Sequence, residues 1–264
     1  MDSRISFLFV DLIRGAALAV MIEVHVFNTF LVPGYRNDLW FPFLNFINGL
    51  VAPSFIFISG FAFIISSKSG LDELRQYRWK FWRKLGRIAL IFVVAYSLHV
   101  PFFSFRNLFV WSSPTDLKNF CNVDVLQCIA AGLLVLFLAR IAIRSDRFFH
   151  IFTITMALFF TLCAPVLWNT DFSRYMPLPL ACYLNEMNGS YFPVFPWAGF
   201  LFAGAAVSTY YMKARETFNE KDFMKKLSIF GFTSAILCFI ILAWLDTFPW
   251  FQLKPSPLFF LERF

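Results

Sequence analysis

The chain has 264 residues, of which 59% are hydrophobic and only 15% are charged, and its mean hydropathy is +0.66. This composition excludes an ordinary soluble domain and is typical of a membrane protein. A net charge of +7 would by itself allow nucleic-acid binding, but the basic residues are distributed as membrane topology requires, and we expect no nucleic-acid partner.

Seven apolar runs are long enough to cross a hydrocarbon core about 30 Å thick, and an eighth begins near Pro257 and stops at Phe264. We therefore expect an all-α fold, a polytopic transmembrane helix bundle of seven complete spans plus the start of an eighth. We expect one transmembrane acyltransferase-like domain, 1–264, without its C-terminal spans. The predicted spans are 5–31, 42–65, 85–105, 125–143, 148–168, 192–212 and 227–246.

The first span carries side chains that are rare in lipid-spanning helices. A charge at the centre of such a helix costs about 2.5–3.5 kcal/mol, so these groups usually face a bundle interior or a wet cavity. Arg14 and His25 lie on nearly the same helix face, roughly 20° apart in direction and about 16 Å apart along the axis. The sequence therefore predicts one functional face with a cation at one depth and an imidazole at another.

Structural roles remain open for the same side chains. Arg14 can pair with Asp11, which lies three positions earlier on the helix. His25 can be a hydrogen-bonded polar residue near the outer interface. Glu23 points about 160° away from His25, so we expect it to pair with another span.

The segment 76–87, QYRWKFWRKLGR, mixes basic and aromatic residues ahead of the third span. This mixture is typical of an interfacial anchor, with rings at headgroup level and cations toward anionic lipid. Alternate segments on one side hold 16 of the 23 Lys and Arg residues, which places the N-terminus in the cytoplasm. We expect an integral protein of a bacterial inner (plasma) membrane, with membrane lipid as a partner and a homo-oligomer as a further option.

In this topology the third span runs outward like the first, so His99 lies at a depth similar to that of His25. The two imidazoles could share a cavity, although an interfacial role explains His99 as well. The five cysteines show no metal-ligand spacing, so we expect no metal site. Cys121 and Cys182 fall in loops on the outer side, where a disulfide between them is an option.

The sixth span begins with prolines and continues with small residues. Gly199 and Gly204, with neighbouring alanines, give it a small-residue face suited to close helix packing. The alternative is that a backbone loosened by Pro193 and Pro196 lines a cavity.

Four segments together resemble known membrane acyltransferases. DLIRGAALAVMIEVH is similar to their first span, and its arginine-x10-histidine element resembles that of the type-3 membrane acyltransferases. The other three resemble, in family order, the catalytic-domain family of heparan-α-glucosaminide N-acetyltransferase. They are APSFIFISGFAFIIS at 52–66, DVLQCIAAGLLVLFL at 124–138 and YFPVFPWAGFLFAGAAVS at 191–208.

The resemblance implies an enzyme that moves an acyl group, expected to be acetyl, from cytoplasmic acyl-CoA to a sugar or glycan on the outer or luminal face. The catalytic candidates are, in order, His25 as base or acyl carrier, Arg14 and His99. The basic residues expected at the CoA phosphates are Arg14, Arg83, Lys84 and Arg87. The acidic residues expected at the carbohydrate acceptor are Glu186 and Asp171, in an outer loop that an ordinary solvated role explains equally well.

Two other interpretations remain open. Intramembrane Asp, Arg and His also form substrate or proton paths in transporters. A chain without its last spans could also be an inactive remnant. Release of CoA thiol distinguishes an acyltransferase, because a transporter moves its solute without consuming acyl-CoA.

Overall fold

The computed structural model describes residues 8–32, 34–35, 40–68, 75–104, 106, 113–217 and 219–244. Within these ranges every regular element is helical, which confirms the all-α prediction. The predicted eighth span, from Pro257 onward, lies outside the described residues.

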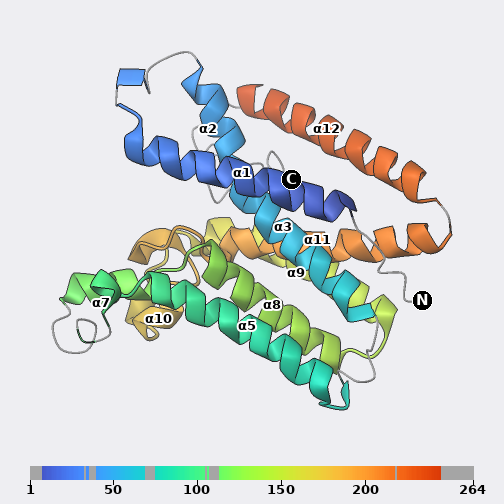
Figure 1. Cartoon of the computed structure of the whole chain (residues 1–264), viewed down its shortest axis with the longest axis horizontal. Helices are drawn as coiled ribbons and strands as arrows, with labels where there is room; N and C mark the ends of the chain where they lie inside the picture. The colour runs from blue at the N-terminus through green and yellow to red at the C-terminus, as the bar shows by residue number, and fades with distance from the viewer. Residues whose placement is uncertain are drawn as a thin grey trace.

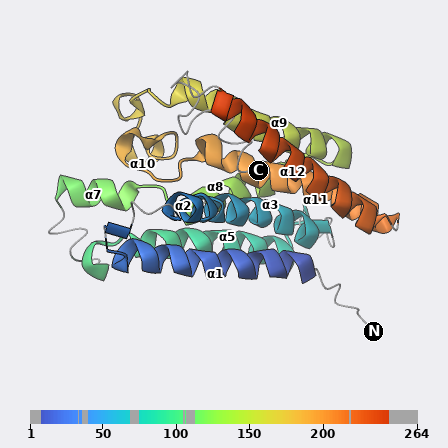
Figure 2. The same ribbon diagram turned by 90° about the horizontal axis from the view of Figure 1, so that it is seen from above.

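Each predicted span corresponds to a long helix (Figure 1). The long helices are α1 (Leu8–Phe30), α3 (Val51–Lys68), α5 (Trp79–Leu98), α8 (Val125–Ala142), α9 (Asp146–Leu167), α11 (Val194–Glu216) and α12 (Glu220–Trp244). Three shorter α-helices are α2 (Phe41–Gly49), α7 (Pro114–Cys121) and α10 (Leu178–Ala181). Figures 1 and 2 show α7 and α10 together at one end of the bundle, opposite the turn between α11 and α12.

Three helical stretches of the described residues are long and apolar enough to cross a membrane. They are Phe43–Ser67, Val125–Ala142 and Asp146–Leu167, which coincide with three of the predicted spans. The helices at the other four predicted spans are formed, and their passage through the membrane stays a prediction.

The predicted span 42–65 is divided at Leu50 into α2 and α3. Pro53 has no amide hydrogen, so the Gly49 carbonyl cannot accept the usual bond from the residue four positions later. The Leu50 amide instead donates to the Ile47 carbonyl at 3.0 Å, and the helix resumes when the Ser54 amide donates to the Leu50 carbonyl at 3.1 Å. The break thus lies within one turn of a proline, where helix kinks are expected.

The core is built around α11, which packs most extensively against α3 and α9. Its residues from Phe195 to Phe202 are all buried, as expected for a helix that is apolar on all sides. Deeper in the bundle, the buried Ser208 hydroxyl donates to the Phe61 carbonyl of α3 at 3.0 Å.

Two glycines allow α3 and α11 to touch through their backbones. A Cβ added at Gly60 would lie 1.9 Å from the Leu201 carbonyl oxygen, and one added at Gly204 would lie 2.0 Å from the Phe57 carbonyl oxygen. Only a residue without a side chain fits at either position. The predicted small-residue face is therefore confirmed at Gly204, and Gly60 is its counterpart on α3.

We expect Gly60→Ala and Gly204→Ala each to lower the free energy of unfolding by about 1–3 kcal/mol, because the added methyl group forces two backbones apart. The matched control is Gly86→Ala on α5, where a Cβ would meet nothing within 4 Å. That substitution should be neutral or stabilise by up to about 1 kcal/mol. Thermal unfolding in detergent micelles measures all three, and equal midpoints would contradict the close contact.

Candidate functional site

Basic side chains gather at one end of the bundle, where α3 and α8 end and α5 and α9 begin. The Lys84 ammonium donates to the hydroxyls of Ser66, at 3.1 Å, and Ser67, and it lies 4.6 Å from the centre of the Phe63 ring. Arg83 and Arg87 are exposed on the same helix, and both are close enough for their charges to act on Lys84. Three of the predicted phosphate-binding residues therefore lie together.

Arg140, near the end of α8, is the most buried cation of this group, with only 9% of the residue exposed. Its Nη2 lies 2.6 Å from Asp146 Oδ1, and its guanidinium lies 4.5 Å from the centre of the Phe149 ring. Its Nη1 is buried and has no hydrogen-bond partner within the described ranges. One guanidinium nitrogen therefore lacks a hydrogen-bond partner in this part of the structure.

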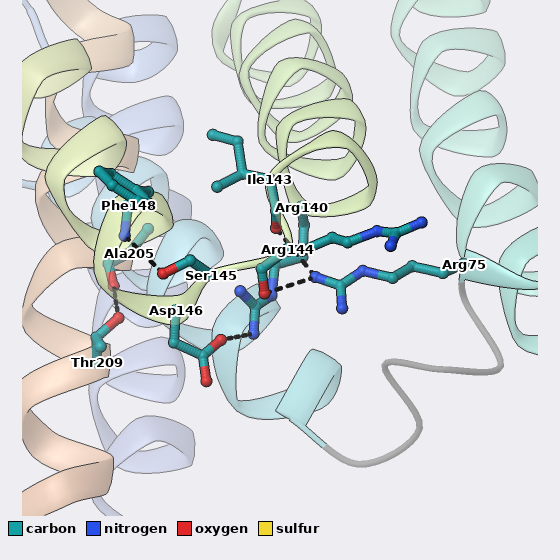
Figure 3. A network of polar contacts seen from close by, with 9 residues as sticks. All are labelled: Arg75, Arg140, Ile143, Arg144, Ser145, Asp146, Phe148, Ala205 and Thr209. Carbon is teal, nitrogen blue, oxygen red and sulfur yellow. Dashed lines mark hydrogen bonds and ion pairs between the residues drawn. The ribbon is translucent and has the colours of Figure 1, made fainter.

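Figure 3 shows Arg75 reaching across to the connection between α8 and α9. Its Nη2 donates to the carbonyls of Ile143, at 3.0 Å, and Arg144, at 3.2 Å. These bonds satisfy carbonyls that a helix end leaves without intrahelical partners. We call Arg75, Arg83, Lys84, Arg87 and Arg140 the basic cluster.

A second group lies at the opposite end of the same helices. His99 follows the last residue of α5, and its Nε2 lies 3.4 Å from Oδ2 of Asp124, the N-cap of α8. Asp124 and Gln127 also form a capping box, in which the Asp124 amide donates to Gln127 Oε1 at 3.1 Å. The imidazole is therefore oriented by a carboxylate that the helix start holds in place.

Two tyrosines and two thiols lie beside this group. The hydroxyls of Tyr96 and Tyr183 are 2.9 Å apart, and burial raises the pKa of Tyr183. Cys121 and Cys182 are free, so the disulfide that the sequence allowed is not formed, and burial raises the pKa of both thiols. They stay protonated at neutral pH and are poor nucleophiles.

An open apolar groove of about 390 Å³ lies between α5, α7 and the start of α10. The residues that line it are Phe92, Val93, Tyr96, Phe120, Cys121 and Pro179. It passes Tyr96, one helical turn before His99, so it adjoins the second group without entering it.

The first-span candidates lie apart from both groups. Arg14 and Asp11 form the expected ion pair at 3.6 Å, and both side chains are more than half exposed. His25 is exposed, and among the described residues neither it nor Arg14 hydrogen-bonds or pairs with the groups above. The Asn48 side chain of α2 forms hydrogen bonds when its amide is oriented with the nitrogen toward Glu23. In that orientation the Asn48 nitrogen donates to Glu23 Oε2 at 2.8 Å.

The acidic acceptor candidates both belong to short 3₁₀ turns of the outer loop. Asp171 caps the turn Phe172–Arg174, where a hydrogen bond from the Ser173 hydroxyl lowers the pKa of its carboxyl group. Glu186 begins the turn Glu186–Asn188 and is half-buried. Asp171 therefore has a local structural role in addition to any contact with a ligand.

Sequence reasoning missed Asp124, Gln127 and Arg140. The Asp-x-x-Gln spacing of a capping box was readable before the apolar run of α8, and it pointed to Asp124 as a fixed carboxylate. Arg140 lies inside the predicted span 125–143, and no local spacing marks it as a site residue. Only the packing of α8 against its neighbours shows that it is buried.

A comparison with models of protein families matches residues 6–252 to the catalytic domain of heparan-alpha-glucosaminide N-acetyltransferase. Comparisons with curated proteins and with solved structures gave no match. The family match includes both groups of polar side chains and the first span.

We expect Arg140→Ala to reduce stability by about 1–3 kcal/mol, because it removes a charge-assisted hydrogen bond to Asp146 and the packing of a buried guanidinium on the Phe149 ring. The matched control is Arg144→Ala, whose side chain is exposed and whose carbonyl still accepts from Arg75. That change should alter stability by less than about 0.5 kcal/mol. Thermal unfolding measures the stability of both variants. An equal loss of stability in the two would show that Arg140 contributes no more than an exposed arginine.

Proposed function

The chain belongs to the catalytic-domain family of heparan-α-glucosaminide N-acetyltransferase, and we propose that it transfers acetyl groups from acetyl-CoA to a carbohydrate across a membrane. The family match over residues 6–252 is the observation that carries this proposal. The acceptor is a sugar or glycan amine or hydroxyl on the outer or luminal face. The protein lies in a plasma membrane with its N-terminus in the cytoplasm, as the distribution of Lys and Arg predicts.

The basic cluster supports a binding site for the phosphates of CoA. Lys84 is held by two hydroxyls and a ring, and Arg140 has a buried nitrogen without a partner in the described structure. Ammonium and guanidinium groups at a helix end bind phosphate through charge-assisted hydrogen bonds. The exposed Arg83 and Arg87 add positive charge at the entrance to this site.

Arg14 and His25 supply the first-span part of the proposal. Their separation of about 16 Å along α1 is comparable with the length of the arm that links the CoA phosphates to the thioester. Arg14 would face the phosphates and His25 the reacting carbonyl. Because both side chains are exposed in the described structure, this part depends on other helices or the donor itself to cover them.

The direct test measures release of CoA thiol from acetyl-CoA by the purified chain, offered a panel of amino sugars and glycans. We expect release that depends on an acceptor, and at least a hundredfold loss in His25→Ala if its imidazole is the base. A folded wild-type protein that releases no thiol with any acceptor would contradict acyl transfer. Solute movement without consumption of acetyl-CoA would instead identify a transporter.

We further expect Lys84→Gln to raise the KM for acetyl-CoA about tenfold or more, because a charge-assisted hydrogen bond contributes about 1.5–3 kcal/mol. The matched control is Lys225→Gln on α12, an exposed lysine outside the basic cluster. An unchanged KM in both variants would show that the donor phosphates bind elsewhere.

A further inference from the structure

The open groove between α5, α7 and α10 is not used by the proposed reaction. Its volume of about 390 Å³ lies in the range of roughly 300–1,000 Å³ that is usual for small-molecule sites. Its wall consists entirely of apolar atoms. A sugar or a nucleotide would find no hydrogen-bond partner in it, and burial of unpaired polar groups is costly. The lining therefore suits a hydrocarbon chain.

The groove continues along the exposed face of α5. Val93, which lines the groove, is itself 62% exposed. Ala89 and Gly86 lie four and seven positions earlier on the same helix face, and both are exposed. A Cβ added at Gly86 would meet nothing within 4 Å. These small residues leave room for an extended chain over about 10 Å more of the helix.

A cation lies beside the α7 wall of the groove. Lys118 is exposed and lies three positions before Cys121, which lines the groove. Its ammonium is also close enough for its charge to act on the thiol of Cys182, directly after α10. Asp116, the carboxylate of the same helix, is instead held by the amide and hydroxyl of Ser113 at the helix start. A phosphate beside the groove therefore has a positive partner in Lys118.

The predicted topology places the groove against the outer leaflet of the membrane. The basic residues at the start of α5 face the cytoplasm, so the end of this helix and α7 face outward. Leu90, Val93 and Leu98 are each 58% or more exposed, and in this position they contact lipid tails. Phospholipids of that leaflet therefore have direct access to the groove, and they combine a hydrocarbon chain with a phosphate.

We propose that the groove binds an acyl chain of an anionic phospholipid of the outer leaflet, with the lipid phosphate at Lys118. The site contains none of the residues assigned to acetyl-CoA or to its acyl group, so it does not rest on the proposed reaction. It rests on the predicted passage of α5 through the membrane. A lipid that bridges α5 and α7 binds only the folded protein and therefore also stabilises it.

The first experiment locates the lipid by photo-crosslinking, using the whole chain in nanodiscs of phosphatidylcholine. The probe is phosphatidylglycerol with a photoreactive diazirine on its acyl chain, and mass spectrometry identifies the labelled peptides. Peptides that contain 92–96 and 120–121 are labelled. An excess of unlabelled phosphatidylglycerol lowers this labelling at least threefold, whereas the same amount of added phosphatidylcholine leaves it unchanged.

A matched pair of variants separates the groove from ordinary contact with lipid. Val93→Trp places an indole ring in the groove and lowers labelling of 120–121 at least fivefold. The control, Val94→Trp, adds the same ring at the next valine of α5, which is exposed and does not line the groove, and leaves labelling unchanged. Thermal unfolding confirms that both variants are folded. Labelling that is equal in wild type and both variants overturns the site.

The headgroup is tested with Lys118→Gln, which lowers the preference for phosphatidylglycerol over phosphatidylcholine at least threefold. The control, Lys225→Gln, removes an exposed lysine of α12 and leaves the preference unchanged. Wild type without any preference overturns the contact with a phosphate. Displacement of the probe by undecaprenyl phosphate at a far lower fraction than by phosphatidylglycerol would assign the groove to an isoprenoid and overturn the phospholipid.

The lipid site and the proposed function fail in different ways. Lys84→Gln, which weakens the binding of acetyl-CoA in the proposed function, leaves labelling of the groove unchanged. Loss of groove labelling in this variant would show that the probe follows the basic cluster, and it would overturn the lipid site. Saturable labelling of the groove by a protein that releases no CoA thiol would refute acyl transfer and leave the lipid site in place.

Discussion

The backbone contact between α3 and α11 is the constraint on which the rest of the structure depends. Gly60 and Gly204 bring the carbonyls of Leu201 and Phe57 to distances that exclude any side chain. This contact fixes the depth and direction of both helices in the core. The end of α3 then carries Ser66 and Ser67 to Lys84. The chain that leads into α11 meets Val123 at the other end of the bundle.

Helix α8 connects the two groups of polar side chains. Asp124 caps its first turn and Arg140 lies in its last, a separation of about 24 Å at the usual helical rise. One end is basic and suits phosphate; the other combines a carboxylate, an imidazole and amides. A single donor molecule that reaches both ends must be elongated, and CoA is elongated.

The sequence predicted those features that depend on local pattern. Apolar runs located the long helices, the i, i+3 spacing predicted the Arg14–Asp11 pair, and small residues predicted the close contact at Gly204. It could not predict which helices lie side by side. The contact of Lys84 with Ser67 joins α5 to α3, and that of His99 with Asp124 joins α5 to α8. Both depend on tertiary packing that no spacing encodes.

Photo-crosslinking with two acetyl-CoA analogues tests most directly whether the basic cluster and the first span serve one reaction. One analogue carries its photoreactive group on the adenine and the other on the acyl chain. The account predicts that the adenine probe labels peptides of the basic cluster, around 79–87, and that the acyl probe labels the α1 peptide around His25. Labelling of the same peptides by both probes, or of neither group, would contradict it.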